Sequence, residues 1–294
     1  MPDYHDEVTR HRKPDWLKIK LHRSEKFGEV ARIVREHGLH TICSSGRCPN
    51  QAECWSRRTA TSMILGDICT RSCKFCATAT GKPLPPDPDE PRKLARSISL
   101  MGLKHCVVTS VDRDDLPDGG AALWAESVRA VRELNPDTTI ELLIPDFDAR
   151  EELIDLVADA RPDILGHNIE TVRRLTPQVR SRARYEVSLR TLAHIARRGL
   201  TAKSGLMVGL GETDSEVLEA VDDLVEAGVQ ILTIGQYLRP SLRHLPVAEY
   251  VTPEKFAWYK EQALARGLRY VESGPMVRSS YMAEKAMRSC RTPK

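Results

Sequence analysis

The stretch TATSMILGDICTRSCKFC, residues 59–76, places three cysteines directly behind a short apolar run. The run at residues 59–65 is predicted to be a β-strand because β-branched and apolar residues dominate it. Cys69, Cys73 and Cys76, here called the downstream triad, follow with the spacing CxxxCxxC. Three thiolates are one fewer than a closed tetrahedral site requires, so the loop predicts an iron–sulfur or metal site with an open position.

Short apolar runs and amphipathic segments alternate through the rest of the chain. Further strands are expected at residues 105–110, 138–144, 163–168, 201–208, 230–235 and, after a break, 268–272. Helices are expected at residues 25–37, 91–101, 121–134, 150–160, 186–198, 214–227 and 253–266. Strands that alternate with helices predict an α/β fold with a parallel sheet.

Polar or glycine-rich segments follow several of the expected strands. They are DRDDLPDGG at residues 112–120, HNIET at 167–171 and GLGET at 209–213. Ligand sites in parallel α/β folds gather at the carboxyl ends of the strands. The pattern therefore favours a barrel-like arrangement, although periodicity alone does not distinguish a barrel from an open sheet.

Length and composition narrow the class of protein. A chain of 294 residues can form one barrel-like domain with terminal extensions. Its 44 basic and 41 acidic side chains give a net charge of +3, which argues against nonspecific nucleic-acid binding. No apolar stretch approaches the length of a membrane span, and neither a secretory nor a transit signal is visible. We expect a cytoplasmic protein without nucleic-acid or membrane partners, in a compartment where clustered cysteines usually bind metal.

A second group of cysteines, here called the upstream triad, precedes the first strand. Cys43, Cys48 and Cys54 have the looser spacing CxxxxCxxxxxC. By spacing alone they can equally be small buried hydrophobic residues. In the downstream triad, Cys73 and Cys76 alone could be half of a zinc site, but no CxxC, CxxH or HxxxH pair elsewhere completes it convincingly.

Two groups of segments resemble known enzymes. GDICTRSCKFC at residues 66–76 resembles the cluster loop of radical S-adenosylmethionine (radical SAM) enzymes. CSSGRCPNQAEC at 43–54, together with RSSY at 278–281, resembles the lipoyl synthase family within that superfamily. ELLIPDF, QYLRPS and the three polar or glycine-rich segments are also similar, so the resemblance runs from about residue 14 to residue 284.

The resemblance implies an architecture. It is an α/β fold built on a partial (β/α)6 TIM-like barrel with N- and C-terminal extensions. The barrel would span residues 58–236. Residues 1–57 would carry the upstream triad, and residues 237–294 would carry the RSSY segment.

The resemblance also implies two 4Fe-4S clusters and S-adenosylmethionine (SAM) as cofactors. The downstream triad would hold the cluster that binds and splits SAM, and Phe75 would shield that cluster. The upstream triad would hold an auxiliary cluster whose fourth iron is bound by the hydroxyl of Ser280. Without the resemblance, nothing in the sequence distinguishes Ser280 from its neighbour Ser279 as the ligand.

The implied activity is sulfur insertion. Two sulfur atoms from the auxiliary cluster would replace hydrogens at C6 and C8 of an octanoyl chain on a lysine of a carrier protein. The carrier would be a 2-oxoacid dehydrogenase E2 lipoyl domain or the glycine cleavage H protein. Further implied partners are a ferredoxin or flavodoxin type reductant and an iron–sulfur cluster carrier.

Several residues are candidates for contact with SAM. By resemblance, Asn168, Glu170 and Arg190 would make polar contacts, and Gly209 and Gly211 would let the backbone approach closely. Without the resemblance, GLGET is an ordinary glycine turn.

For three more polar residues, the sequence allows two interpretations each. Asp112 and Asp114 either face the site or cap the helix that follows them. Lys203 either faces the pocket or is exposed at the end of a strand.

Two alternatives to lipoyl synthase remain at this point. One is another two-cluster radical SAM sulfurtransferase such as biotin synthase, which is not expected to combine the upstream triad with RSSY. The other, of a different class, is a zinc-binding interaction module.

Overall fold

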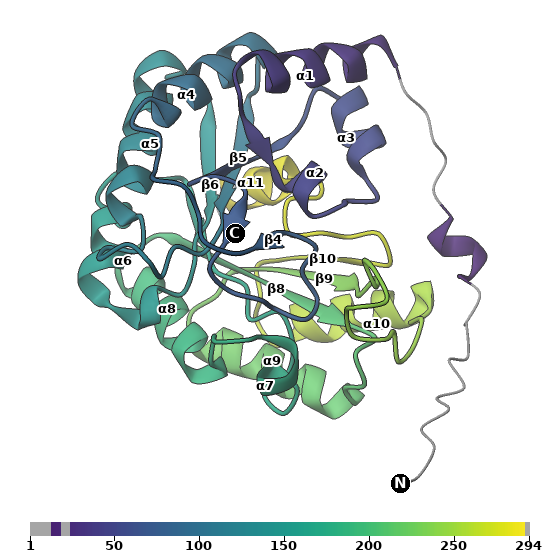
Figure 1. The fold of residues 1–294 in the computed structure, drawn as a ribbon. Helices are drawn as coiled ribbons and strands as arrows, with labels where there is room; N and C mark the ends of the chain where they lie inside the picture. Colours follow the sequence, from purple (N-terminus) through teal and green to yellow (C-terminus); the bar gives the residue numbers. More distant parts are fainter. Residues whose placement is uncertain (1–12, 19–23, 292–294) are drawn as a thin grey trace, which may run out of the picture.

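An eight-stranded sheet curves through the middle of the protein (Figure 1). The fold is that of a computed structural model that describes residues 13–18 and 24–291. The spatial order of the strands is β1, β2, β5, β6, β7, β8, β9, β10. β1 pairs antiparallel with β2, and every later neighbouring pair is parallel. The strands are β1 (His40–Thr41), β2 (Thr61–Ile64), β5 (His105–Ser110), β6 (Thr139–Leu143), β7 (Ile164–Gly166), β8 (Thr201–Val208), β9 (Ile231–Gln236) and β10 (Tyr270–Gly274).

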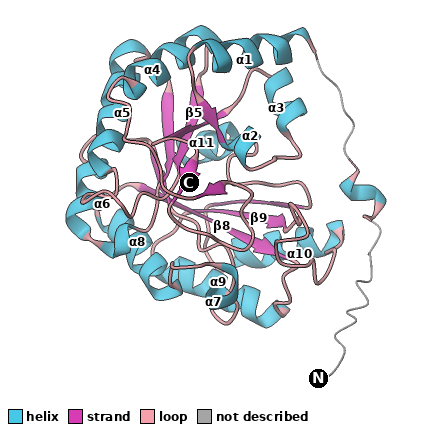
Figure 2. Ribbon diagram, viewed as in Figure 1, coloured by secondary structure: helices cyan, strands magenta, loops and turns pink. Residues whose placement is uncertain are grey.

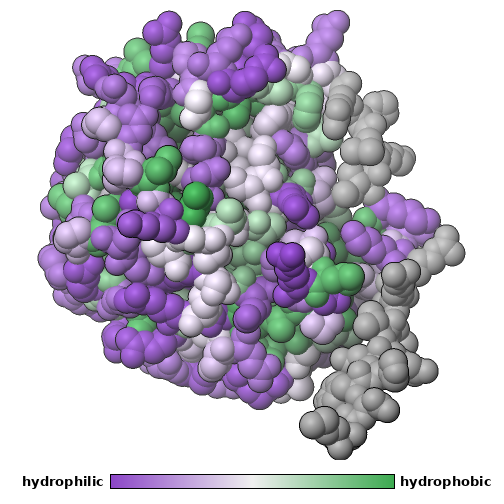
Figure 3. Space-filling model, in the orientation of Figure 1, coloured by the Kyte–Doolittle hydropathy of each residue, from purple (hydrophilic) through white to green (hydrophobic). Residues whose placement is uncertain are grey.

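Helices cover the outer face of this sheet (Figure 2), and the rim of the molecule is mostly hydrophilic in the same orientation (Figure 3). They are α4 (Glu90–Met101), α5 (Ala121–Leu134), α6 (Glu151–Ala158), α8 (Tyr185–Arg197), α9 (Asp214–Glu226) and α10 (Pro253–Ala265). Each turns an apolar stripe toward the strands, as Val217, Val221 and Leu224 do on α9. The expected α/β fold of the partial TIM-barrel type is confirmed. Among the helices that the structure describes, none combines the length and the apolar character of a membrane-spanning segment.

The N-terminal extension packs on the barrel as a small unit of its own. It contains α1 (Glu25–Glu36), α2 (Ile42–Ser45) and α3 (Gln51–Ser56). Val30, Ile33 and Trp55 form its buried centre together with Cys43. The two-residue strand β1 ties this unit to β2, and it is too short to be visible as a pattern in the sequence.

The C-terminal part of the chain returns to the barrel twice. β10 pairs with β9 and so extends the barrel sheet beyond residue 236. The chain then runs into α11 (Ala283–Arg291), whose Ala286 packs against Ile164 and Ile231 at the first residues of β7 and β9. In Figure 1, α11 lies within the ring of strands, behind the loops that follow them. The helix therefore closes the amino end of the barrel, and the carboxyl end remains for a site.

Candidate active site

A cavity of about 570 Å³ lies at the carboxyl ends of the barrel strands. It is lined by Cys43 and Cys48 from the upstream triad and by all three cysteines of the downstream triad. Ser279 and Ser280 of the RSSY segment line the same space. Segments from the beginning, middle and end of the sequence thus meet at one place.

The loop that carries the downstream triad leaves β2 through a tight turn. Leu65 has φ 67° and Gly66 has φ 91°, so the chain turns sharply after the strand. The backbone N–H of Leu65 donates to the carboxylate of Glu90 at 2.8 Å, and its carbonyl accepts from Arg113 at 3.1 Å. A small parallel pair, β3 (Ile68–Cys69) with β4 (Ala79–Thr80), closes the loop.

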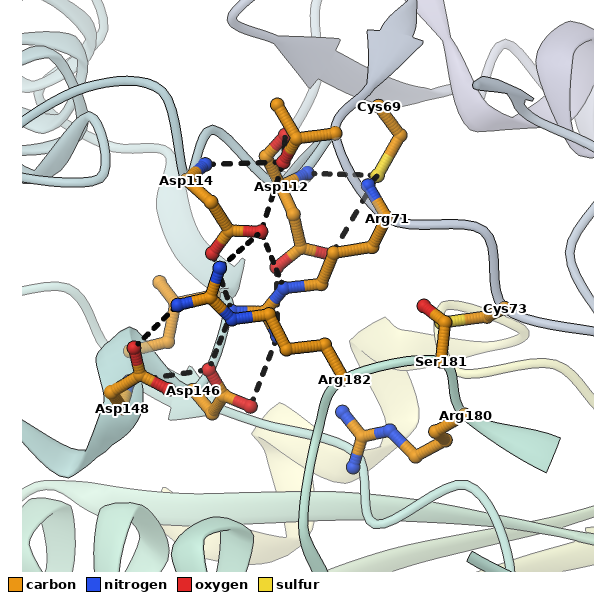
Figure 4. A network of polar contacts seen from close by, with 12 residues as sticks. Cys69, Arg71, Cys73, Asp112, Asp114, Asp146, Asp148, Arg180, Ser181 and Arg182 are labelled. Carbon is orange, nitrogen blue, oxygen red and sulfur yellow. Dashed lines mark hydrogen bonds and ion pairs between the residues drawn. The ribbon is translucent and has the colours of Figure 1, made fainter. Parts of the chain in front are cut away.

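A buried arginine fixes this loop to the barrel (Figure 4). Arg71 donates to both carboxylate oxygens of Asp146 at 3.0 Å and to Asp114 at 2.8 and 2.9 Å. Asp112 lies 3.4 Å from the same guanidinium. Burial would raise the pKa of Asp146, but the hydrogen bonds from Arg71 overcome it and lower that pKa to about 2.

These contacts decide between the two readings of the aspartates after β5. Asp112 and Asp114 bind the cluster loop through Arg71, so the interpretation that they cap the next helix is wrong. The helix is capped instead by Asp118, which accepts from the backbone N–H groups of Gly120 and Ala122 at 3.0 Å.

The thiol groups of the two triads lie in protected surroundings. Burial raises the pKa of Cys69 and of Cys54 to about 12 and also raises the pKa of Cys48 and Cys76. Backbone N–H groups of Arg71 and Asp112 donate to the Cys69 sulfur at 3.4 and 3.3 Å. A bound iron would favour the thiolate form of these side chains.

Each triad supplies three soft thiolates, one fewer than a closed tetrahedral zinc site requires. In a tetrahedral zinc site the sulfurs lie about 3.8 Å apart, because each zinc–sulfur bond is about 2.3 Å. Within the part of the chain that the structure describes, no three Cys, His, Asp or Glu side chains are grouped closely enough to share one ion. As a donor set, the two triads fit iron–sulfur clusters that leave one position open.

Asn168 and Glu170, which follow β7, both line this cavity. The Asn168 amide Nδ2 donates to Glu170 Oε1 at 3.1 Å and to Ser279 Oγ at 2.7 Å. A Cβ atom on Gly205 would lie 2.7 Å from the Asn168 side-chain oxygen, so this glycine in β8 provides the room for the amide. Burial raises the pKa of Glu170.

An arginine that the sequence analysis did not select completes this wall. Arg180 follows the short helix α7 (Thr176–Val179), lines the cavity and is buried. Its Nη1 donates to the Asn168 carbonyl at 3.3 Å and to Ser188 Oγ at 2.9 Å. Its buried Nε has no hydrogen-bond partner among the described residues, so an anionic ligand group would satisfy it.

The structure places three predicted SAM contacts away from this cavity. Arg190 is exposed on α8. Gly209 and Gly211 have φ 95° and 104°, but neither is among the residues that line the cavity. A Cβ atom on Gly209 would lie 2.5 Å from the carbonyl of Glu249, so this glycine accommodates neighbouring chain rather than a ligand. Phe75, by contrast, lines the cavity and packs against the core.

The RSSY segment and its flanks are held against the N-terminal extension and the first barrel strand. The side-chain amide of Asn50 donates to the Met276 carbonyl at 2.7 Å, and Arg57 pairs with Glu284 at 2.8 Å. Ser280 Oγ accepts from Thr61 Oγ1 at 2.7 Å. Segments that carry the upstream triad are therefore fixed to the segment that carries the serines.

A buried ion pair lies deeper in the barrel. Lys203 of β8 and Glu141 of β6 are in contact, and both line the cavity. Burial would raise the pKa of Glu141, but Lys203 overcomes this effect and lowers it. Lys203 thus faces the pocket and is not an exposed residue at a strand end.

Comparison with known proteins gives relatives along nearly the whole chain. Residues 63–224 match the Radical SAM superfamily. A lipoyl synthase from Parabacteroides distasonis is 62% identical over 274 residues, which cover 93% of this chain and 98% of the relative. A lipoyl synthase from Porphyromonas gingivalis is 57% identical over 275 residues, covering 93% of this chain and 98% of the relative.

The fold is also similar to solved structures of low sequence identity. The crystal structure of Streptococcus suis SuiB bound to S-adenosylmethionine aligns with a TM-score of 0.56 at 11% identity, over 76% of this chain and 54% of that one. HydG, a maturase of the [FeFe]-hydrogenase, aligns with a TM-score of 0.54 at 12% identity, over 76% of this chain and 61% of that one. Both similarities concern the fold.

Proposed function

Since the chain belongs to the radical SAM superfamily and, within it, to the lipoyl synthases, we propose that its cavity is the site of this family's sulfur insertion. The enzyme inserts two sulfur atoms into a protein-bound octanoyl-lysine, and it uses SAM and 4Fe-4S clusters. The observation that carries the assignment of the site is that one cavity is lined by the whole downstream triad, by Cys43 and Cys48 of the upstream triad, and by Ser280. Biotin synthase and a zinc module do not account for that combination.

In this proposal the downstream triad holds the cluster that works with SAM. When bound and reduced, the pair supplies a carbon-centred radical able to remove hydrogen from an unactivated carbon, which acid–base groups cannot do. Cys69, Cys73 and Cys76 provide three thiolates, and the fourth position is left to the cofactor. Phe75 keeps water from this region.

The wall formed by Asn168, Glu170 and Arg180 is proposed to receive the polar parts of SAM. The free Nε of Arg180 suits the methionyl carboxylate, because a charged donor and acceptor form a strong hydrogen bond in a buried site. Glu170 and Asn168 suit the amino group and the ribose hydroxyls. These side chains bind and orient the cofactor.

The auxiliary cluster is proposed to be the sulfur substrate, held by the upstream triad and Ser280. An oxygen ligand is harder than a thiolate and is the one expected to dissociate first when the cluster is opened. Apolar side chains line the same cavity and suit an octanoyl chain; among them are Val107, Leu142, Ile144, Leu206 and Val277. The chain of the substrate would thus lie between its oxidant and its sulfur source.

The proposed partners follow from this chemistry. The carrier is an octanoylated E2 lipoyl domain or glycine cleavage H protein, and electrons come from a ferredoxin or flavodoxin type reductant. An iron–sulfur cluster carrier rebuilds the auxiliary cluster after each turnover. We place these reactions in the cytoplasm.

The test is mass spectrometry of an octanoylated carrier after incubation with the anaerobically reconstituted protein, a reductant and SAM. We expect about eight irons per chain, from two four-iron clusters, and a product that has gained two sulfur atoms. A parallel incubation with dethiobiotin in place of the carrier tests the biotin synthase alternative. One zinc without sulfide, or sulfur transfer to dethiobiotin alone, would refute the proposed function.

A further inference from the structure

The two adjacent serines of the RSSY segment have partners on opposite sides of the cavity. Ser280 Oγ accepts a hydrogen bond from Thr61 on β2, the strand that pairs with the N-terminal extension. Ser279 Oγ accepts one from Asn168, which follows β7. Both bonds are 2.7 Å long. Because successive Cα atoms are about 3.8 Å apart, neither serine can shift far without moving the other.

The amide of Asn168 has little freedom to turn. Its Nδ2 uses its two hydrogens on Ser279 and Glu170. Its Oδ1 lies close against Gly205, because a Cβ atom added to that glycine would be only 2.7 Å from this oxygen. The Asn168 backbone carbonyl accepts from Arg180. A ligand that binds Glu170 or the Asn168 side-chain oxygen therefore acts on the same amide that holds Ser279, and a ligand that binds Arg180 acts on the backbone of Asn168.

The segment around the serines is anchored on both flanks. Asn50 holds the Met276 carbonyl at 2.7 Å, and Arg57 holds Glu284 at 2.8 Å. Val277 is equally confined, since a Cβ atom on Gly235 would lie 2.2 Å from its carbonyl oxygen. A displacement of Ser279 is therefore passed to Ser280 and is not absorbed by a loose loop.

We propose that Ser279 is a positioning residue that couples the SAM pocket to the auxiliary cluster. SAM fixes the Asn168 side chain through Glu170 and the Asn168 backbone through Arg180. Asn168 then holds Ser279, and Ser279 sets the position of the Ser280 oxygen. The proposal rests on the proposed function, because it takes SAM and the auxiliary cluster as the two ligands. Coupling of this kind is reciprocal, so Ser280 on the cluster strengthens SAM binding by the same factor.

The test uses the reconstituted protein and S-adenosylhomocysteine, which lacks the sulfonium that is cleaved. Hydrogen exchange, followed by mass spectrometry, reports the protection of residues 276–284 with and without this ligand. We expect the ligand to slow exchange about fivefold in the wild type, the effect of one hydrogen bond. Ser279→Ala should lose this slowing, and Ser279→Thr, which keeps the hydroxyl, should restore it.

Two further variants keep the test decisive. Ser280→Ala should retain the slowing, because Ser279 still meets Asn168. Gly205→Ala, which displaces the Asn168 amide, should lose the slowing even if Ser279→Ala fails to fold.

Equal protection in the wild type and in Ser279→Ala would overturn the coupling alone. A reconstituted protein that does not bind S-adenosylhomocysteine would overturn the proposed function and the coupling together.

Discussion

Arg71 and Asp146 form a two-pronged hydrogen-bonded ion pair, with both carboxylate oxygens 3.0 Å from the guanidinium. Arg71 lies inside the downstream triad, between Cys69 and Cys73, whereas Asp146 lies just beyond β6. The pair therefore connects the cluster loop directly to the barrel. A planar guanidinium in this geometry orients the loop as well as holding it.

Arg71→Met should destabilise the protein strongly. The side chains of Arg71 and Asp146 are 4% and 1% exposed, so removal of the arginine leaves buried carboxylates unpaired. We expect the free energy of unfolding to fall by about 3–5 kcal/mol, measured by denaturant titration. Arg92→Met is the matched control, because Arg92 pairs with Asp89 on the surface. A change no larger than that of the control would show that the network contributes little.

The two triads should be separable by substitution. Cys73→Ala should abolish formation of 5'-deoxyadenosine from SAM, because the downstream cluster loses a ligand. Cys48→Ala should leave that cleavage largely intact and prevent formation of the lipoyl product. Chromatography of 5'-deoxyadenosine and mass spectrometry of the carrier measure the two outcomes. Product formed by Cys48→Ala would remove the sulfur-donor role from the upstream triad.

Ser280→Ala should resemble Cys48→Ala, with SAM cleavage retained and sulfur insertion lost. Thr61→Val removes only the hydrogen-bond donor to Ser280 and should have a smaller effect. Loss of one such bond corresponds to about 1 kcal/mol, or about a fivefold fall in the rate of product formation. If Ser279→Ala formed no product and Ser280→Ala kept full activity, Ser279 would be the ligand of the auxiliary cluster and Ser280 would not.

Arg180→Met should weaken SAM binding by about 10- to 100-fold, the value of a hydrogen bond to a charged group. Arg190→Met is the control, because Arg190 is exposed on α8. Equilibrium binding of S-adenosylhomocysteine to the reconstituted protein measures both variants. If Arg190→Met weakened binding and Arg180→Met did not, the assignment of the cavity wall would be reversed.

Acid should destabilise the protein through His167. Burial lowers the pKa of His167 from 6.5 to about 4, and its ring nitrogens bond the Ile144 carbonyl and Ser188. Between these pH values the unfolded chain binds more protons than the folded chain. The contribution of His167 to the free energy of unfolding is therefore fully present above pH 6.5 and is lost as the pH drops toward 4. The whole loss is about 3 kcal/mol. Denaturant titrations at several pH values should show this slope in the wild type and a flatter curve in His167→Gln.

The barrel could be read from the sequence because its strands and helices are regular. The predicted strands at residues 105–110 and 201–208 and the helix at 121–134 coincide with β5, β8 and α5. Their apolar periodicity is strong, and local pattern is most reliable in such segments. β1 and α7 were not predicted, since elements of two and four residues leave no period.

The cavity wall was harder to predict. Arg180 and Arg190 lie in one arginine-rich stretch, and nothing local distinguishes them. Arg180 is buried because the turn after α7 runs against the cluster loop, where the Lys74 N–H donates to the Val179 carbonyl at 2.8 Å. That contact joins residues far apart in sequence. The role of Gly209 was similarly hidden, because the residue that needs its space is Glu249.

Helix α11, which closes the amino end of the barrel, has a consequence for the direction of approach. Ala286 covers the first residues of β7 and β9, whereas the cavity lies at the carboxyl ends of the strands. Under the proposed function, SAM and the octanoyl arm would therefore both approach from the side away from α11.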